Sequence, residues 1–299
     1  MLLILTLILL PFVNHYFGIP LSDYEWQVVR KLIYAALGFA ILAFAVSSVT
    51  HNYSQVDKLW SLLPIGYVGY VCLQAHLNTR LILMLVIVTI WGIRLTYNFS
   101  RKGAYQWPPW KGEEDYRWKV LKSKPELNAP WKWALFNLFF ISMYQNALIL
   151  LFTLPAIIAL QNKDHPVTVF DIIVILCMFL FIVYETVADE QQWKYQSTKW
   201  NKIKSGEPLP DEFKKGFIDT GLWSVSRHPN YFAEQMIWAS FYLFSVSSGG
   251  PWLNWSFAGS LLLILLFQGS AQFSEEISAG KYPEYKEYQK RVSRFIPRI

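Results

Sequence analysis

Polar side chains recur at helical spacing inside one strongly apolar stretch of the sequence. Glu185, Asp189 and Gln192 stand at positions i, i+4 and i+7, so an α-helix presents all three on one face. Carboxylates and amide oxygens accept hydrogen bonds from hydroxyl groups such as those of a ribose. Ionisable groups are costly at membrane depth and mark functional sites there. This stripe therefore predicts one wall of a polar binding site.

Three more segments carry polar groups of the same kinds. The candidates are Arg94, Asn98 and Arg101 in one segment, Arg227, His228, Asn230, Tyr231 and Glu234 in a second, and Asp57 in a third. Guanidinium groups bind phosphate and carboxylate groups with paired hydrogen bonds. Such a combination suits a nucleotide-like cofactor, with a lipid-soluble substrate that arrives from the bilayer. The alternative interpretation is that each residue only faces the lipid headgroups at the end of its helix.

Other kinds of site lack their usual patterns. The sequence contains neither G-x-G-x-x-G nor G-x-x-x-x-G-K-[ST], so nothing indicates a soluble dinucleotide or P-loop site. The five histidines show no i, i+4 pairing, and Cys72 and Cys177 lie isolated in apolar runs, so we expect no metal. The sequence also lacks the G-x-S-x-G elbow that would indicate a serine hydrolase.

Composition defines the elements that must position these residues. Of the 299 residues, 54% are hydrophobic and only 16% are charged, against roughly 25% charged in soluble domains. We expect an all-α, polytopic transmembrane helical bundle of about seven or eight spans, with a C-terminal cytoplasmic amphipathic tail. The net charge of +6 indicates basic loops beside a membrane, because no soluble domain is present to bind nucleic acid.

Apolar runs of about 18 or more residues mark the spans. The expected helices lie at about 1–20, 31–50, 59–77, 80–98, 133–160, 168–188, 231–248 and 252–273. The first run contains Pro11, Asn14 and His15. It lacks a basic n-region and an A-x-A-like cleavage site, so we expect a retained helix rather than a signal peptide.

The basic residues orient these spans. With eight spans, 23 lysines and arginines fall on one side of the membrane and 4 on the other. The positive-inside rule then places the basic loops and the candidate site at the cytoplasmic face. We expect an integral, multi-pass protein of the endoplasmic reticulum in a eukaryote, or of the inner membrane in a bacterium. The loop over 99–132 mixes tryptophans with basic residues, so it either anchors the protein at the headgroups or forms a lid.

Several motifs resemble those of one membrane-enzyme superfamily. They are Trp91-Gly92-x-Arg94-Leu95, Glu185-x-x-x-Asp189-x-x-Gln192, Gly221-Leu222-Trp223, Ser226-Arg227-His228-Pro229-Asn230-Tyr231-Phe232, and a tail with Tyr282, Tyr285, Tyr288 and Phe295-Ile296-Pro297. In order and spacing they resemble the steroid 5α-reductase-like superfamily, and more closely its DUF1295 branch. The likeness covers roughly residues 50–299 and implies a catalytic membrane domain over 51–299. The N-terminal transmembrane helices over 1–50 are expected from their apolar runs alone.

The resemblance also implies a reaction. Its reductase members imply NADPH, held here by Arg94, Asn98, Asp189, Asn230 and Glu234, and hydride transfer to the conjugated double bond of a sterol-like or other lipid enone. In those relatives a tyrosine precedes the equivalent of Arg94 by three residues, where this sequence has Trp91. Those relatives also use a glutamate on an earlier helix, for which Asp57 is the best candidate here, so Asp57 and Arg94 are the catalytic candidates. An expected arginine beyond Asp189 is missing as well, and Lys194 or Lys199 could replace its contact with the cofactor phosphate.

A rival resemblance leaves the cofactor open. Arg227-His228-Pro229-x-Tyr231 and Glu275-Glu276, followed by the tail tyrosines, are also similar to isoprenylcysteine carboxyl methyltransferases. That family implies S-adenosylmethionine in a similar place. A third alternative is a sterol- or lipid-binding membrane protein without catalysis.

Overall fold

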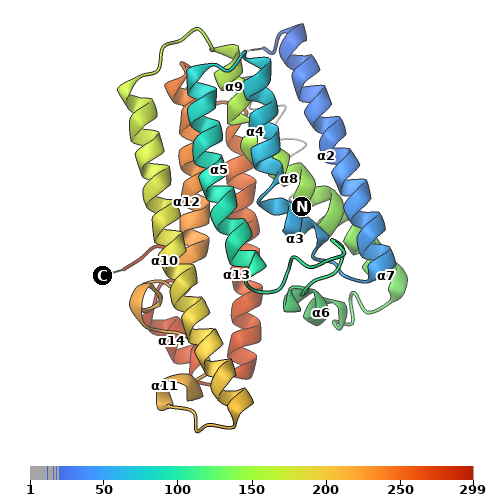
Figure 1. Ribbon diagram of the computed structural model, residues 1–299, viewed down its shortest axis with the longest axis vertical. Helices are drawn as coiled ribbons and strands as arrows, with labels where there is room; N and C mark the ends of the chain where they lie inside the picture. The colour runs from blue at the N-terminus through green and yellow to red at the C-terminus, as the bar shows by residue number, and fades with distance from the viewer. Residues whose placement is uncertain (1–11, 13–15, 17, 19, 299) are drawn as a thin grey trace. The chain divides into compact units, whose positions relative to one another are not determined.

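The structure, a computed structural model, describes residues 20–298 together with Phe12, Tyr16 and Gly18 (Figure 1). Within this part of the chain all regular structure is helical. Five helices are long and apolar enough to cross a membrane: Asp23–Thr50, Thr79–Ser100, Pro130–Gln161, Val169–Ser205 and Phe257–Lys281. The predicted polytopic all-α fold is confirmed, whereas the helix expected at 1–20 lies almost wholly outside the described residues.

The helices follow the expected runs with local differences. Their bounds are α2 (Asp23–Thr50), α3 (Gln55–Trp60), α4 (Leu63–Gln74), α5 (Thr79–Ser100), α6 (Tyr116–Lys122), α7 (Pro130–Phe136), the π-helix η1 (Asn137–Tyr144), α8 (Gln145–Thr153), α9 (Pro155–Gln161), α10 (Val169–Ser205), α11 (Asp211–Lys214), the 3₁₀ helix η2 (Gly221–Ser224), α12 (Pro229–Ser247), α13 (Phe257–Lys281) and α14 (Tyr285–Arg291). α2 begins earlier than expected because Ser22 and Glu25 form a capping box at its start.

The run expected as a single helix at 59–77 is broken. α3 ends at Trp60 and α4 begins at Leu63. Pro64 explains the break, since its ring clashes with the carbonyl four residues earlier and it has no N–H to donate. The 12 residues of α4 extend about 18 Å, less than the roughly 30 Å of a bilayer's hydrocarbon core. α12 is long enough, but polar residues near its start keep it out of the five apolar helices.

The chain divides into two compact units. The first contains the described residues up to Leu176 together with Ala239–Leu263, and the second contains Cys177–Trp238 and Ile264 onward. The expected domain boundary near residue 50 stays a prediction.

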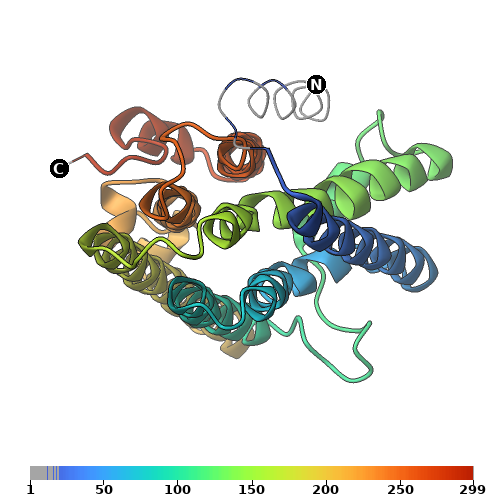
Figure 2. The same cartoon turned by 90° about the horizontal axis from the view of Figure 1, so that it is seen from above.

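Close helix packing organises the first unit. α2 packs against η1 and α8, as Figure 2 shows from above. α4 lies against α5, where the hydroxyls of Ser61 and Thr96 are 2.7 Å apart. A Cβ at Gly92 of α5 would come within 2.6 Å of the Ser61 carbonyl oxygen, so only glycine permits this approach.

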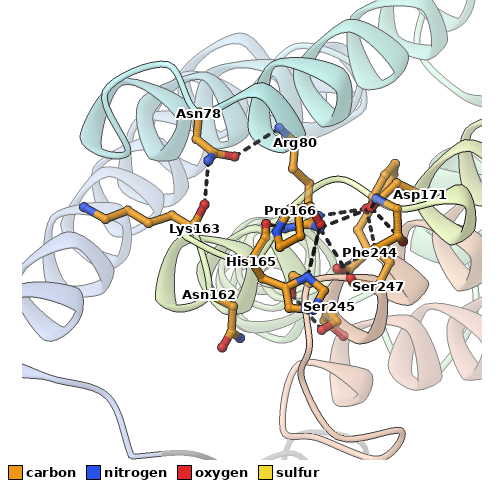
Figure 3. Close-up of polar contacts among 12 residues, drawn as sticks. Asn78, Arg80, Asn162, Lys163, His165, Pro166, Asp171, Phe244, Ser245 and Ser247 are labelled. Atoms are coloured by element: carbon orange, nitrogen blue, oxygen red, sulfur yellow. Dashed lines mark hydrogen bonds and ion pairs between the residues drawn. The ribbon is translucent and has the colours of Figure 1, made fainter.

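A buried ion pair fixes one end of this unit (Figure 3). Arg80, in the first turn of α5, donates from Nε to Asp171 Oδ1 over 2.8 Å, and both side chains are shielded from solvent, with exposures of 1% and 0%. The guanidinium also donates to the carbonyls of His165 and Pro166. Ser247 donates its hydroxyl to Asp171 at 2.6 Å. The pair therefore joins the starts of α5 and α10 to the end of α12.

Aromatic packing holds the C-terminal part of the second unit. Tyr285 and Tyr288 of α14 are buried against Phe217. Trp223 of η2 donates its indole N–H to the Ala188 carbonyl of α10 over 3.1 Å. On the other face of α14 the charged residues Glu287 and Lys290 are exposed and pair with each other. The tail helix is therefore amphipathic, as predicted.

Candidate functional site

Two of the predicted polar stripes meet within the second unit. Asn230, at the start of α12, donates from Nδ2 to Asp189 Oδ1 of α10 over 3.2 Å. Glu185 lies one turn before Asp189 on α10 and is buried. Glu234 lies one turn after Asn230 and accepts a hydrogen bond from the Trp238 indole at 3.1 Å. An amide of α12 and a carboxylate of α10 are therefore in direct contact.

Two polar atoms beside this contact lack partners. Asn230 Oδ1 and Gln192 Oε1 are both inaccessible to solvent, and neither forms a hydrogen bond with any described residue. A buried oxygen without a donor costs roughly 1–3 kcal/mol, so such atoms are normally satisfied. Both atoms are acceptors. This part of the site is therefore suited to a ligand that brings hydroxyl or amide N–H donors.

Arg227 and His228 are gathered around a residue of α13. Arg227 donates from Nε to Glu275 Oε1 over 2.8 Å, and His228 Nε2 lies 3.1 Å from the same oxygen. Gln289 and Arg294 donate to Glu275 Oε2 at 3.0 and 3.2 Å. Arg227 also donates from Nη1 to the carbonyl of Gln289. These contacts anchor the C-terminal segment, and a direct role in cofactor binding for either residue stays a prediction.

Burial favours the uncharged form of the histidine in this group. Burial lowers the pKa of His228 below its usual value, while the Glu275 carboxylate opposes the shift. The ring of Tyr231 stacks on that of His228, with 5.2 Å between centroids, and it also packs on Phe267. At neutral pH this arrangement favours an uncharged imidazole, held in place by an aromatic neighbour.

The α5 candidates lie on one face of their helix in the first unit. Arg101 donates from Nε to Asn98 Oδ1 over 3.0 Å, and its guanidinium lies over the Tyr97 ring. Arg94 is half-buried one turn before Asn98, and Trp91 is fully buried. The two groups of candidates thus belong to different units, and their union in a single pocket stays a prediction.

Asp57 lies in a polar group that the sequence does not reveal. Trp118 donates its indole N–H to Asp57 Oδ2 over 3.2 Å. Burial, and secondly the negative charge of Asp115, raise the pKa of Asp57 to about 6. A carboxyl group with such a pKa can hold or release a proton near neutral pH. This is the behaviour required of the predicted acid.

Tyr105 also belongs to this group and was missed by sequence reasoning. Its hydroxyl donates to the Lys58 carbonyl over 2.9 Å, next to Asp57 in the chain. Burial is the main reason that its pKa is raised, and the charge of Asp57 adds to that effect. Tyr105 lies in a loop without helical periodicity, so no pattern points to it. It brings a phenol to this group although Trp91 has none.

Lys199 is already engaged in the second unit. Its ammonium group is buried and donates to the Gly216 carbonyl at 2.9 Å and to the Tyr282 hydroxyl at 3.4 Å. Of the two lysines expected to replace the missing arginine, only Lys194 is exposed. No group of three or more histidine, cysteine or acidic side chains that could hold a metal ion occurs among the described residues.

Comparisons with known proteins place this chain in a family. The family model described as "Protein of unknown function (DUF1295)" matches residues 43–292. A protein of Schizosaccharomyces pombe (strain 972), itself described as uncharacterised, is 38% identical over 293 residues, which cover 93% of this chain and 83% of the relative. No solved structure matches.

Proposed function

Because this chain belongs to the DUF1295 family, we propose that it is a membrane-embedded, NADPH-dependent reductase of a lipid-soluble enone. The observation that carries the proposal is the hydrogen-bonded pair of Asp189 and Asn230, with a second, unsatisfied oxygen on Asn230. The likeness to the steroid 5α-reductase-like superfamily supplies the class of reaction.

The residues present fit the proposed cofactor. Ribose hydroxyls and the nicotinamide carboxamide are hydrogen-bond donors, and Asn230 Oδ1 and Gln192 Oε1 are buried acceptors that need donors. Lys194, which is exposed on α10 in the same unit, is the candidate for the contact with the cofactor phosphate. NADPH supplies a hydride when it is bound. The chain's share is to orient it, to exclude water and to provide a proton.

Asp57 is the proposed source of that proton. With its pKa raised to about 6, Asp57 stays partly protonated near neutral pH. Tyr105 lies beside it and can relay or stabilise the proton through its hydroxyl. In this role Asp57 polarises the carbonyl oxygen of the enone as electrons move onto it.

The same residues fit the alternative cofactor, S-adenosylmethionine, less well. The methyltransferase resemblance assigns ribose and ammonium binding to carboxylates such as Glu275. Both oxygens of Glu275 already accept hydrogen bonds from Arg227, Arg294 and Gln289. This occupancy favours NADPH over S-adenosylmethionine.

A stability titration of the full chain in detergent tests the cofactor. At 100 times its dissociation constant, a ligand adds about 2.7 kcal/mol to the free energy of unfolding. We expect NADPH to raise the melting temperature and S-adenosylmethionine to leave it unchanged. Asn230→Ala should weaken the NADPH effect, whereas Glu190→Gln, an exposed neighbour of Asp189, should preserve it. Stabilisation by S-adenosylmethionine alone would refute the reductase proposal, and a response to neither would favour a purely lipid-binding protein.

A further inference from the structure

The loop between α5 and α6 is hydrogen-bonded to α3 and to the segment that joins α2 to α3. Asn52 donates from Nδ2 to the Gly112 carbonyl over 2.9 Å, and Gln55 donates from Nε2 to the Trp110 carbonyl over 3.0 Å. The buried ammonium of Lys58 donates to the Lys111 carbonyl over 2.6 Å. Each of these bonds ends on the loop's backbone. The loop is therefore held in one shape, and these bonds do not use the side chains of Trp110 and Lys111.

One glycine makes this shape possible. Gly112 has a φ of 122°, and a Cβ there would come within 2.0 Å of the Ala104 carbonyl oxygen. Only glycine fits both the backbone conformation and the close approach. The loop's fold is thus specified locally, and it does not depend on a ligand.

This loop and the residues at the end of α2 line an open cavity of about 480 Å³. This volume is within the range of small-molecule sites. The cavity is lined by Thr50, Asn52, Gln106, Trp110, Lys111, Gly112 and Glu113. Thr50 and Asn52 use their side chains to hold the wall, through bonds to Val46 and to Gly112.

Three of the other lining side chains are available to contact a ligand. Among the described residues, neither the Lys111 ammonium nor the Glu113 carboxylate has a hydrogen-bond or ion-pair partner, and both residues are exposed. Trp110 is 48% exposed, so part of its ring is open to a ligand. One cation, one anion and one indole therefore line the same small cavity.

The position of the cavity limits what can enter it. Thr50 is the last residue of α2, which is long and apolar enough to span a membrane. A cavity at the end of a span lies at the depth of the lipid headgroups. Trp107 is 88% exposed in the same loop, and exposed tryptophans are typical of that interface.

We propose that this cavity binds the headgroup of a zwitterionic phospholipid. Lys111 pairs with the phosphate, Glu113 pairs with the ammonium, and Trp110 adds a cation–π contact to the ammonium. An anionic headgroup gains only the contact with Lys111 and is repelled by Glu113. This lipid site is independent of the proposed reductase activity.

Native mass spectrometry of the full chain in detergent tests the proposal with dihexanoyl phosphatidylcholine. Dihexanoyl phosphatidylglycerol tests the preference for charge, and glycerophosphocholine, which has no acyl chains, tests a water-soluble source. We expect phosphatidylcholine to bind at least about tenfold more tightly than either of the other two. Phosphatidylglycerol lacks the charge-assisted contact with Glu113, which is worth about that factor, and glycerophosphocholine lacks the apolar contacts of the acyl chains.

Charge-removing variants locate the site. Lys111→Gln should weaken phosphatidylcholine and phosphatidylglycerol binding alike. Glu113→Gln should weaken phosphatidylcholine binding about tenfold and strengthen phosphatidylglycerol binding. Lys119→Gln and Glu126→Gln, which remove exposed charges that do not line the cavity, should change neither. The proposal is overturned if both cavity variants bind phosphatidylcholine as the wild type does, if phosphatidylglycerol binds more tightly to the wild type, or if glycerophosphocholine binds as tightly as the lipid.

Discussion

Arg227 donates to Glu275 over 2.8 Å although 48 residues separate the two in the chain. The contact holds the segment before α12 to the last third of α13. From there Arg227 reaches the carbonyl of Gln289, while the backbone N–H groups of Arg227 and His228 donate to the Ser293 and Arg294 carbonyls. The Glu275 carboxylate therefore holds the C-terminal tail next to the start of α12.

Removing the charge of Glu275 should release that tail. Glu275→Gln leaves Arg227 with a buried, uncompensated charge, a change that costs about 3–5 kcal/mol in comparable sites. Limited proteolysis with trypsin should then cleave faster after Arg291 and Arg294. The control is Glu276→Gln, because Glu276 is the exposed next residue and its side chain accepts a hydrogen bond from Gln272 on the same helix. Equal cleavage rates in the two variants would contradict the anchoring role.

Asp57 should make the protein's stability depend on pH. Its pKa rises from an ordinary value near 3.8 to about 6 on folding, so the folded protein binds more protons than the unfolded chain between these values. The free energy of unfolding therefore falls as the pH rises from about 4 to about 6. Asp57→Asn removes this loss, so its melting temperature should exceed that of the wild type at pH 7 and approach it at pH 4. The exposed Asp164→Asn should show no such trend, and a gap that stays constant with pH would refute the account.

Substitutions of Arg80 and Asp171 should have strongly non-additive effects on the free energy of unfolding. Arg80→Met leaves a buried carboxylate without its partner and should lower the free energy of unfolding by about 3–5 kcal/mol. Adding Asp171→Asn to that variant should recover part of the loss, because no unpaired charge then remains. Thermal unfolding in detergent measures both, with Arg30→Met as the control at an exposed arginine. Additive losses in the double variant would show that the two side chains act independently.

The distribution of basic residues predicts which loops face the cytoplasm. A single cysteine introduced at Ser205, the last residue of α10, should be protected from an impermeant thiol reagent in sealed, right-side-out membranes. One introduced at Asp164, between α9 and α10, should react. The reverse pattern would invert the orientation, and with it the expected cytoplasmic access of the cofactor.

Sequence reasoning succeeded where periodicity or long apolar runs carry the signal. The expected helix 80–98 differs from α5 by only one residue at its start and two at its end. The stripes that contain Asp189 and Asn230 were predicted from spacing, but the hydrogen bond between these two residues was not. The break in the run at 59–77 could have been read from Pro64, which is incompatible with a continuous helix there.

Long-range contacts gave no such signal. Tyr105 reaches the Asp57 group from a loop without helical or strand period, and Trp118 reaches it from the short helix α6. The partners of Glu275 come from three separate segments, and only folding brings them together. The polar groups could therefore be predicted residue by residue on each helix, but the ion pairs that anchor them could not.

The reductase proposal is tested most directly by following hydrogen from cofactor to product. The purified protein is incubated with a lipid enone, such as a sterol ketone, and with NADPH that carries deuterium at its transferable position. We expect a saturated ketone with one deuterium on the carbon β to the carbonyl, and no such product from Asp57→Asn. If no enone is reduced while the methyl group of S-adenosylmethionine appears in lipid, the account of this family member as a reductase is contradicted.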